Sequence, residues 1–309
     1  MDPEPSAARL AGQLVEERGS RLPALLEAMR PRQWSKNVFV LAGIVFAGRL
    51  FEVRAELRAM AVFAVFCAAA SSVYLANDVA DRVSDAHHPL KRLRPIASGR
   101  LAPPAAAAAA AALAAVALAG AALLNRATFA ITAGYLASTF AYSFGLKRVF
   151  LLDVMIVAAG FVLRAAVGAA AIDAAISPWL LVCTFLLALF LALGKRRAEL
   201  VLLGLGAQSH RAALGQYSLA LLDSWLTALC GAAIVSYAIY TQSERTVEHF
   251  GTTNLLFTVP FVIYALFRYQ HHLVREDAGG DPGSLLMRDP GLWAALLGWA
   301  VTAAVVIYR

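Results

Sequence analysis

Long apolar segments recur along the whole chain, and their length constrains the fold more than any other feature. An α-helix needs about 20 apolar residues to cross the hydrocarbon core of a bilayer. Of the 309 residues, 60% are hydrophobic and only 15% are charged. Lipid offers no water to exposed backbone groups, so a chain spans it only as helices or as a closed barrel. The sequence therefore predicts an all-α polytopic membrane protein.

Nine segments are apolar enough to be interpreted as transmembrane helices of one bundle. The first is short and follows Trp34, an expected anchor at the membrane interface. The predicted spans cover residues 37–51, 59–79, 103–124, 127–144, 150–171, 178–193, 218–240, 252–268 and 291–308. Residues 30–309 are predicted to form a single domain. Residues 1–29 lack the apolar core of a signal peptide, and an amphipathic surface helix is expected over 10–29.

The distribution of basic residues predicts the orientation. With the N-terminus in the cytoplasm, 20 of the 27 Lys and Arg residues fall in cytoplasmic segments and 6 in external ones. This bias agrees with the positive-inside rule. The net charge of +7 is therefore explained by membrane topology, and nucleic acid is not an expected partner.

An acidic column follows the second predicted span. Asn77, Asp81 and Asp85 are spaced four residues apart, so on a continued helix they share one face, which Asp78 borders. These groups repel one another unless a positive charge joins them, and hard oxygen ligands of this kind suit Mg²⁺ bridging to a substrate phosphate. The alternative is a charged helix end solvated by water. We expect all four residues to bind Mg²⁺ and face the cytoplasm.

Basic residues cluster in the segments predicted to lie on the same side of the membrane as the acidic column. They are candidates for binding substrate phosphates. For residues 147–148 and 195–197 the alternative is a role in membrane topology alone. The candidates are Lys36, Lys91, Arg92, Arg94, Lys147, Arg148, Lys195, Arg196 and Arg197.

Other ionisable residues are expected to have structural roles. Asp153 is interpreted as an acid favoured by the helix dipole, with support of the site as the alternative. Arg164 lies inside a predicted span, where a charge is costly, and is expected to contact other helices or backbone carbonyls. His87, His88, His271 and His272 are expected to be solvated loop residues. Cys67, Cys183 and Cys230 are expected to pack as small apolar residues.

Nine helices with the motif Asn-Asp-x-x-Asp-x-x-x-Asp after the second resemble the UbiA superfamily of intramembrane transferases. The motif is matched at Asn77, Asp78, Asp81 and Asp85. The resemblance implies that Mg²⁺ activates a pyrophosphate leaving group, with Asp81 and Asp85 as the catalytic carboxylates.

The chain departs from this superfamily after the sixth span. Most members carry a second motif, Asp-x-x-x-Asp, where residues 194–199 here read Gly-Lys-Arg-Arg-Ala-Glu. Such a basic loop is suited to binding phosphate directly. Residues 30–37, 91–99 and 194–199 resemble one branch, the decaprenyl-phosphate phosphoribosyltransferases. That branch transfers phosphoribose from 5-phosphoribosyl 1-pyrophosphate to a polyprenyl phosphate, toward the arabinan of cell-wall arabinogalactan. The resemblance implies a bacterial inner membrane, and an oligomer of identical chains is left open.

Two other functions are weighed. A prenyltransferase of the UbiA type would move a prenyl group from its pyrophosphate to an aromatic or lipid acceptor, but the basic loop at 194–199 disfavours it. A transporter with an acidic cation site would place ionisable residues near the bilayer midplane. Here the acidic residues gather at one membrane face.

The orientation is tested by labelling cysteines introduced one at a time into a chain that lacks its three native cysteines. An impermeant reagent applied to intact cells is expected to label position 244 and to leave positions 91 and 196 unlabelled. Labelling at position 91 without labelling at position 244 would show that the predicted orientation is reversed.

Overall fold

The computed structural model describes residues 24–87, 90–203, 212–275, 285 and 289–308. Within these residues every regular element is a helix, which confirms the all-α prediction. The predicted surface helix over 10–29 lies mostly outside the described residues, and only α2 (Ala24–Met29) is seen. The long helices are α4 (Val53–Ala86), α5 (Pro103–Leu124), α6 (Arg126–Phe144), α7 (Leu152–Ala171), α8 (Pro178–Leu203), α10 (Leu219–Gln242), α12 (Val259–Arg275) and α14 (Pro290–Tyr308).

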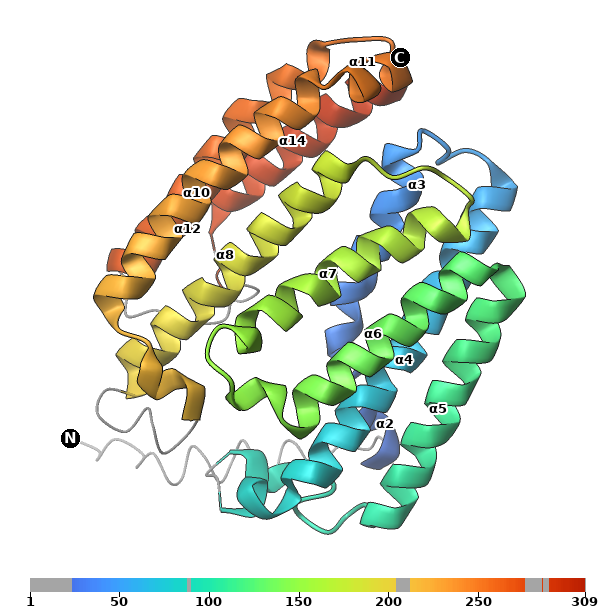
Figure 1. Ribbon diagram of the computed structural model, residues 1–309, viewed down its shortest axis with the longest axis vertical. Coiled ribbons are helices and arrows are strands. Elements are labelled where there is room, and N and C mark those ends of the chain that lie inside the picture. The colour runs from blue at the N-terminus through green and yellow to red at the C-terminus, as the bar shows by residue number, and fades with distance from the viewer. Residues whose placement is uncertain (1–23, 88–89, 204–211, 276–284, 286–288, 309) are drawn as a thin grey trace, which may run out of the picture.

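The long helices lie side by side along one common direction (Figure 1). Helices α4, α5 and α6 form one side of the bundle, α7 and α8 the middle, and α10, α12 and α14 the other side. Shorter elements complete the ends: α3 (Ala42–Phe46), α11 (Glu244–Phe250) and the 3₁₀ helices η1 (Pro31–Leu41), η2 (Lys91–Leu93), η3 (Leu146–Arg148), η5 (Ala212–Gln216) and η6 (Asn254–Thr258).

Six helices are long and apolar enough to cross a membrane, namely α4, α5, α7, α8, α10 and α14. The segments Glu244–Phe250 and Asn254–Arg275 would together make a seventh, although they are bent by 101°. Predicted spans 37–51 and 127–144 are not among them, so the count of nine stays a prediction. The chain is a multi-pass membrane protein.

The first predicted span is not one regular helix. The chain forms η1, then α3, and turns from residue 47 onward. The segment lies close against α7, since a Cβ at Gly168 would overlap the backbone of Val40. Trp34, predicted as an interface anchor, donates a hydrogen bond from Nε1 to Ser71 Oγ at 3.0 Å. This segment is therefore packed into the bundle against α4 and α7.

Alanine on α5 allows this helix to lie close to α4. Ala106, Ala110, Ala117 and Ala121 are buried along one face, at spacings of four and seven residues. Ser72 on α4 donates a hydrogen bond to the Ala110 carbonyl at 2.7 Å. Small residues permit such close helix approach in membranes, as the alanine-rich sequence predicts. Two of the cysteines are buried within the bundle, Cys183 is partly exposed, and all three are free thiols.

Arg164 on α7 is a buried charge, and each of its three guanidinium nitrogens donates a hydrogen bond. Its guanidinium donates to Asn37 Oδ1 at 3.0 Å, to the Tyr135 hydroxyl at 2.8 Å and to the Gly160 carbonyl at 2.8 Å. These bonds join η1, α6 and α7. The predicted structural role for Arg164 is confirmed, and its cost in an apolar bundle is offset by these hydrogen bonds.

The prediction for the second histidine pair is wrong. His271 and His272 lie in α12 rather than in a loop. His272 contacts the Asp289 carboxylate just before α14, and Arg268 Nε donates to the same carboxylate at 2.7 Å. The Arg268 hydrogen bond holds the pKa of Asp289 well below its usual range. His87 follows the last residue of α4 and is exposed, as predicted for a solvated residue, while His88 lies outside the described residues.

Replacing Arg164 with Met is expected to destabilise the bundle. The loss leaves Asn37 and Tyr135 without their partner, at about 1 to 3 kcal/mol for each unsatisfied buried group. The measurement is the thermal midpoint of the purified protein in detergent, with Arg126→Met as the control because Arg126 is exposed. Equal midpoints for the two variants would contradict this role.

Candidate active site

The acidic motif occupies the last turns of α4. This helix runs unbroken from Val53 to Ala86, with no Gly or Pro inside it, so the predicted column at Asn77, Asp81 and Asp85 is confirmed as helical. Asp78 and Asp85 are 2% and 3% exposed. A carboxylate that is buried as a charge must be paired, and the structure pairs each of the three aspartates with a basic side chain.

Two arginines hold Asp78 and Asp85. Arg30 Nη2 donates to Asp78 Oδ1 at 2.5 Å, and Arg94 Nη1 contacts the same oxygen at 3.2 Å and Asp85 Oδ2 at 2.6 Å. Arg94 thus bridges two aspartates that lie two helical turns apart. Its neighbour Ile96 is buried against Leu75, which anchors this connection on α4.

A lysine holds Asp81. Lys147 in η3 donates from Nζ to both carboxylate oxygens of Asp81 at 2.7 Å and contacts Asn77 Oδ1 at 3.3 Å. Three oxygens from two residues of α4 therefore converge on one positive charge. This contact brings the connection between α6 and α7 to the motif, as Figure 1 shows for the lower end of these helices.

Arg30 was not predicted as a site residue. It has a left-handed backbone, with φ of 56°, just before Pro31. Such a conformation costs about 1 to 3 kcal/mol for a residue other than glycine. The ion pair with Asp78, together with its position over the Tyr74 ring at 5.0 Å, holds Arg30 there. No local pattern reveals a partner 48 residues away.

The connection between α4 and α5 is held in place near its end by an ion pair. Arg100 donates to both carboxylate oxygens of Glu27 on α2, at 2.7 and 3.0 Å. These hydrogen bonds raise the pKa of Arg100. Gly99 has a φ of 79°, which glycine adopts without strain. Lys91 and Arg92 lie exposed in η2 of the same connection, and Lys36 is exposed on η1.

Residues 195–197 do not form the predicted loop. Helix α8 continues to Leu203, so Lys195, Arg196 and Arg197 are helical. Arg196 is 5% exposed and donates to Asp153 at 2.8 Å and to Glu199 at 2.6 Å. Arg197 donates to Asp223 at 2.5 Å and to the carbonyl of Leu273. Two of these three cations are therefore paired within the bundle, while Lys195 is exposed.

Asp153 does more than complement a helix dipole. It lies in the first turn of α7 as predicted, yet it is fully buried and also accepts a hydrogen bond from the Tyr217 hydroxyl at 2.7 Å. Burial and this hydrogen bond raise the pKa of Tyr217 above its usual range. Sequence reasoning missed Tyr217 and Asp223, since neither carries a local signal.

The motif oxygens suit a hard divalent cation, but protein cations hold them in this structure. Within the described residues, no group of three or more His, Cys, Asp or Glu side chains is arranged to hold a metal ion. The donor set itself, three carboxylates and an amide, is the kind that Mg²⁺ prefers. The convergence of Asn77 and Asp81 on Lys147 Nζ shows that these oxygens can surround one positive charge.

Similar solved structures share this fold. A UbiA homologue from Archaeoglobus fulgidus bound to GPP and Mg²⁺ superposes with a TM-score of 0.69 at 19% identity, covering 93% of this chain and 100% of that one. A structure of the same homologue bound to DMAPP and Mg²⁺ also has a TM-score of 0.69, at 18% identity over 92% of this chain and 98% of that one. The predicted UbiA fold is confirmed.

Similar sequences cover nearly the whole chain. A decaprenyl-phosphate phosphoribosyltransferase from Corynebacterium glutamicum is 33% identical over 307 residues, covering 95% of this chain and 91% of that protein. One from Mycolicibacterium smegmatis is 35% identical over 297 residues and covers 92% of each. Residues 37–199 match the UbiA prenyltransferase family. With its fold, its acidic motif and these relatives in agreement, the chain belongs to the UbiA prenyltransferase family.

Proposed function

We propose that this chain transfers 5-phosphoribose from 5-phosphoribosyl 1-pyrophosphate to a polyprenyl phosphate such as decaprenyl phosphate, and releases pyrophosphate. The observation that carries the proposal is the pairing of the α4 carboxylates with Arg30, Arg94 and Lys147, which come from three separate segments. The names of the similar proteins support the phosphoribosyl group and the decaprenyl phosphate acceptor. The product would enter the synthesis of cell-wall arabinan.

Both substrates are anions, so the site must hold two groups that repel one another. Fixed cations do this and also stabilise charge that develops on the leaving group. Arg94 and Lys147 are already positioned among the motif carboxylates. When the donor binds, we expect them to exchange a carboxylate partner for a phosphate oxygen. Lys36, Lys91, Arg92, Arg148 and the basic end of α8 at Lys195, Arg196 and Arg197 are further candidates for phosphate contacts.

This exchange would free the motif oxygens for a metal ion. We infer that Asn77, Asp78, Asp81 and Asp85 would hold Mg²⁺, and the divalent metals of the solved relatives support this choice. When bound, Mg²⁺ would neutralise charge on the departing pyrophosphate. The four motif side chains would hold the positive charge of the metal ion next to the ribose.

The reaction needs little proton transfer. An oxygen of the acceptor phosphate attacks carbon one of the ribose, and the bond from this carbon to pyrophosphate breaks with its electron pair on the leaving group. The acceptor is already anionic, so the site needs no general base. The side chains described above therefore act by binding and orienting the two phosphates.

We propose that the site opens to the cytoplasm of a bacterial cell, across a bundle of nine spans. Phosphorylated sugars are cytoplasmic metabolites, and the basic residues support this orientation. The ends of α4 and α8 and the connection between α6 and α7 lie at the same end of the bundle (Figure 1). The polyprenyl tail would lie between helices, open to lipid.

The donor assay tests the proposal directly. Membranes containing the chain are expected to transfer label from phosphoribosyl pyrophosphate to polyprenyl phosphate. A labelled prenyl pyrophosphate, offered with an aromatic or lipid acceptor, is expected to give no product. Transfer of the prenyl group, without transfer of phosphoribose, would establish the alternative of a conventional prenyltransferase.

Two further arms of the assay examine the metal. EDTA is expected to abolish turnover and added Mg²⁺ to restore it. Asp81→Asn is expected to lose nearly all activity, because the amide lacks the charge that holds the ion, while Asp173→Asn at the other end of the bundle retains it. Full turnover in EDTA would exclude a metal-dependent step.

Replacing Lys147 with Ala is expected to raise the KM for phosphoribosyl pyrophosphate by roughly ten- to a hundred-fold. A charge-assisted hydrogen bond is worth about 1.5 to 3 kcal/mol, which gives this range. Steady-state kinetics in membranes supplies the measurement, with a smaller change expected in the KM for polyprenyl phosphate. Arg82→Ala is the matched control, because Arg82 follows Asp81 on α4 but is exposed. A donor KM unchanged in both variants would remove Lys147 from the site.

A further inference from the structure

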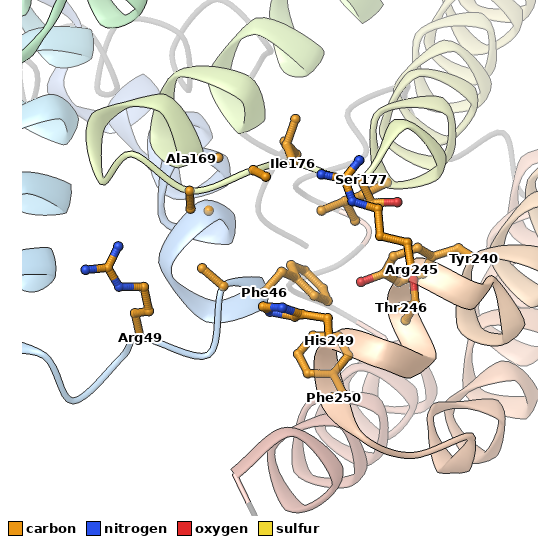
Figure 2. Close-up of a pocket in the computed structure, with 15 residues that line it drawn as sticks. Phe46, Arg49, Ala169, Ile176, Ser177, Tyr240, Arg245, Thr246, His249 and Phe250 are labelled. Carbon is orange, nitrogen blue, oxygen red and sulfur yellow. The ribbon is translucent and has the colours of Figure 1, made fainter.

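A hollow lies at the end of the bundle opposite the acidic motif. Its volume is about 260 Å³, and its walls come from α3, the connection between α7 and α8, the end of α10 and α11 (Figure 2). None of the residues assigned to the phosphoribosyl site lines it. It lies beside α11, which is bent by 101° from the helical segment that follows.

The lining combines positive charge with an apolar wall. Arg49, Arg245 and His249 are the basic lining residues, and among the described residues that form the walls there is no Asp or Glu. Phe46 and Leu180 belong to the apolar wall. The acidic neighbours on α11 are Glu244 and Glu248, which are exposed and do not line the hollow. The interior therefore favours an anion.

Three hydrogen-bond donors in this hollow have no partner among the residues that the structure describes. Ser177 Oγ is buried without a hydrogen bond. Tyr240 is 3% exposed, and within the described part of the chain its hydroxyl makes no hydrogen bond. Arg245 forms no ion pair there either, whereas Arg49 is held by Glu52 and by the carbonyl of Ile172. Figure 2 shows Arg245 extending toward Ser177, with Tyr240 and Phe46 beside the same space.

Of these donors, the Ser177 hydroxyl is fully buried, and a buried donor without a partner is costly unless a ligand or water satisfies it. A phosphate group offers several acceptor oxygens and a negative charge, which match an arginine and two hydroxyls. The aromatic and aliphatic wall suits a hydrocarbon chain joined to that phosphate. A free phosphate ion would leave this wall without a partner.

We propose that the hollow binds the phosphate headgroup of an anionic membrane lipid on the side opposite the transferase site. Arg245 and the hydroxyls of Ser177 and Tyr240 contact the phosphate, and the lipid chain passes along Phe46 and Leu180. This site is independent of the proposed reaction, because its residues come from the other end of the bundle.

The test is a binding titration with the purified full-length chain in a neutral detergent. The probe is dihexanoyl phosphatidic acid, and isothermal calorimetry measures its affinity. Saturable binding is expected, with Arg245→Gln weakening it by about ten-fold or more, as the loss of a charge-assisted hydrogen bond requires. Tyr240→Phe is expected to weaken it by a smaller factor. Arg54→Gln is the control, because Arg54 is an exposed arginine at the start of α4 that does not line the hollow.

Two comparison ligands define the chemistry. Dihexanoyl phosphatidylcholine and inorganic phosphate are both expected to bind more weakly than the phosphatidic acid. Equal affinity for phosphatidylcholine would contradict the proposal that the headgroup must be anionic. Equal affinity for inorganic phosphate would contradict the proposal that the ligand is a lipid. Binding weakened equally in Arg245→Gln and Arg54→Gln, or in neither, would overturn the site. Arg245 is exposed, so its replacement is expected to leave the thermal midpoint unchanged.

Discussion

Charge balance at one end of α4 organises the active end of this bundle. The helix carries its acidic motif to Ala86, and two of the motif carboxylates are almost fully buried. Buried carboxylates must be paired. The partners of the three motif aspartates come from elements that are short or irregular: the residue before η1, the residue after η2, and η3. These connections therefore take their positions from the carboxylates that they neutralise. A substrate phosphate and a metal ion that enter together would preserve the same balance, since each supplies the charge that the other removes.

The same rule governs the polar groups deeper in the bundle. Arg164 joins three elements through neutral acceptors, and Arg196 joins α8 to α7 through Asp153. In an apolar setting these contacts hold particular helices together, because a misplaced neighbour would leave a charge without its partner. Arg164 lies in the middle of the bundle, with a hydrogen bond from each guanidinium nitrogen, whereas Arg196 neighbours an exposed lysine at the end where the motif lies.

The two ends of the bundle consequently have different chemistry. At the motif end, acids and bases are paired with one another. At the other end, the hollow beside α11 presents an arginine and two hydroxyls that lack partners within the described part of the chain, and none of the described residues that line it is a carboxylate. An anion fits the second arrangement without any rearrangement of ion pairs. A membrane protein with these two ends would bind a metal with its substrate on one side and an anionic lipid on the other.

The sequence by itself determined the class of fold and the acidic motif. Apolar runs and the positions of Asn77, Asp81 and Asp85 are local patterns, so the helices and the column could be predicted from spacing alone. The broken helical path of residues 37–51 could not be predicted, because the segment packs at Val40 against Gly168, which lies more than 100 residues away in the sequence. The sequence also could not predict which charged residues form ion pairs. These pairs are Arg30 with Asp78, Lys147 with Asp81, and Arg196 with Asp153. The sequence gives the charge of each residue. Its ion-pair partner depends on which helices pack side by side, and only the tertiary structure decides that.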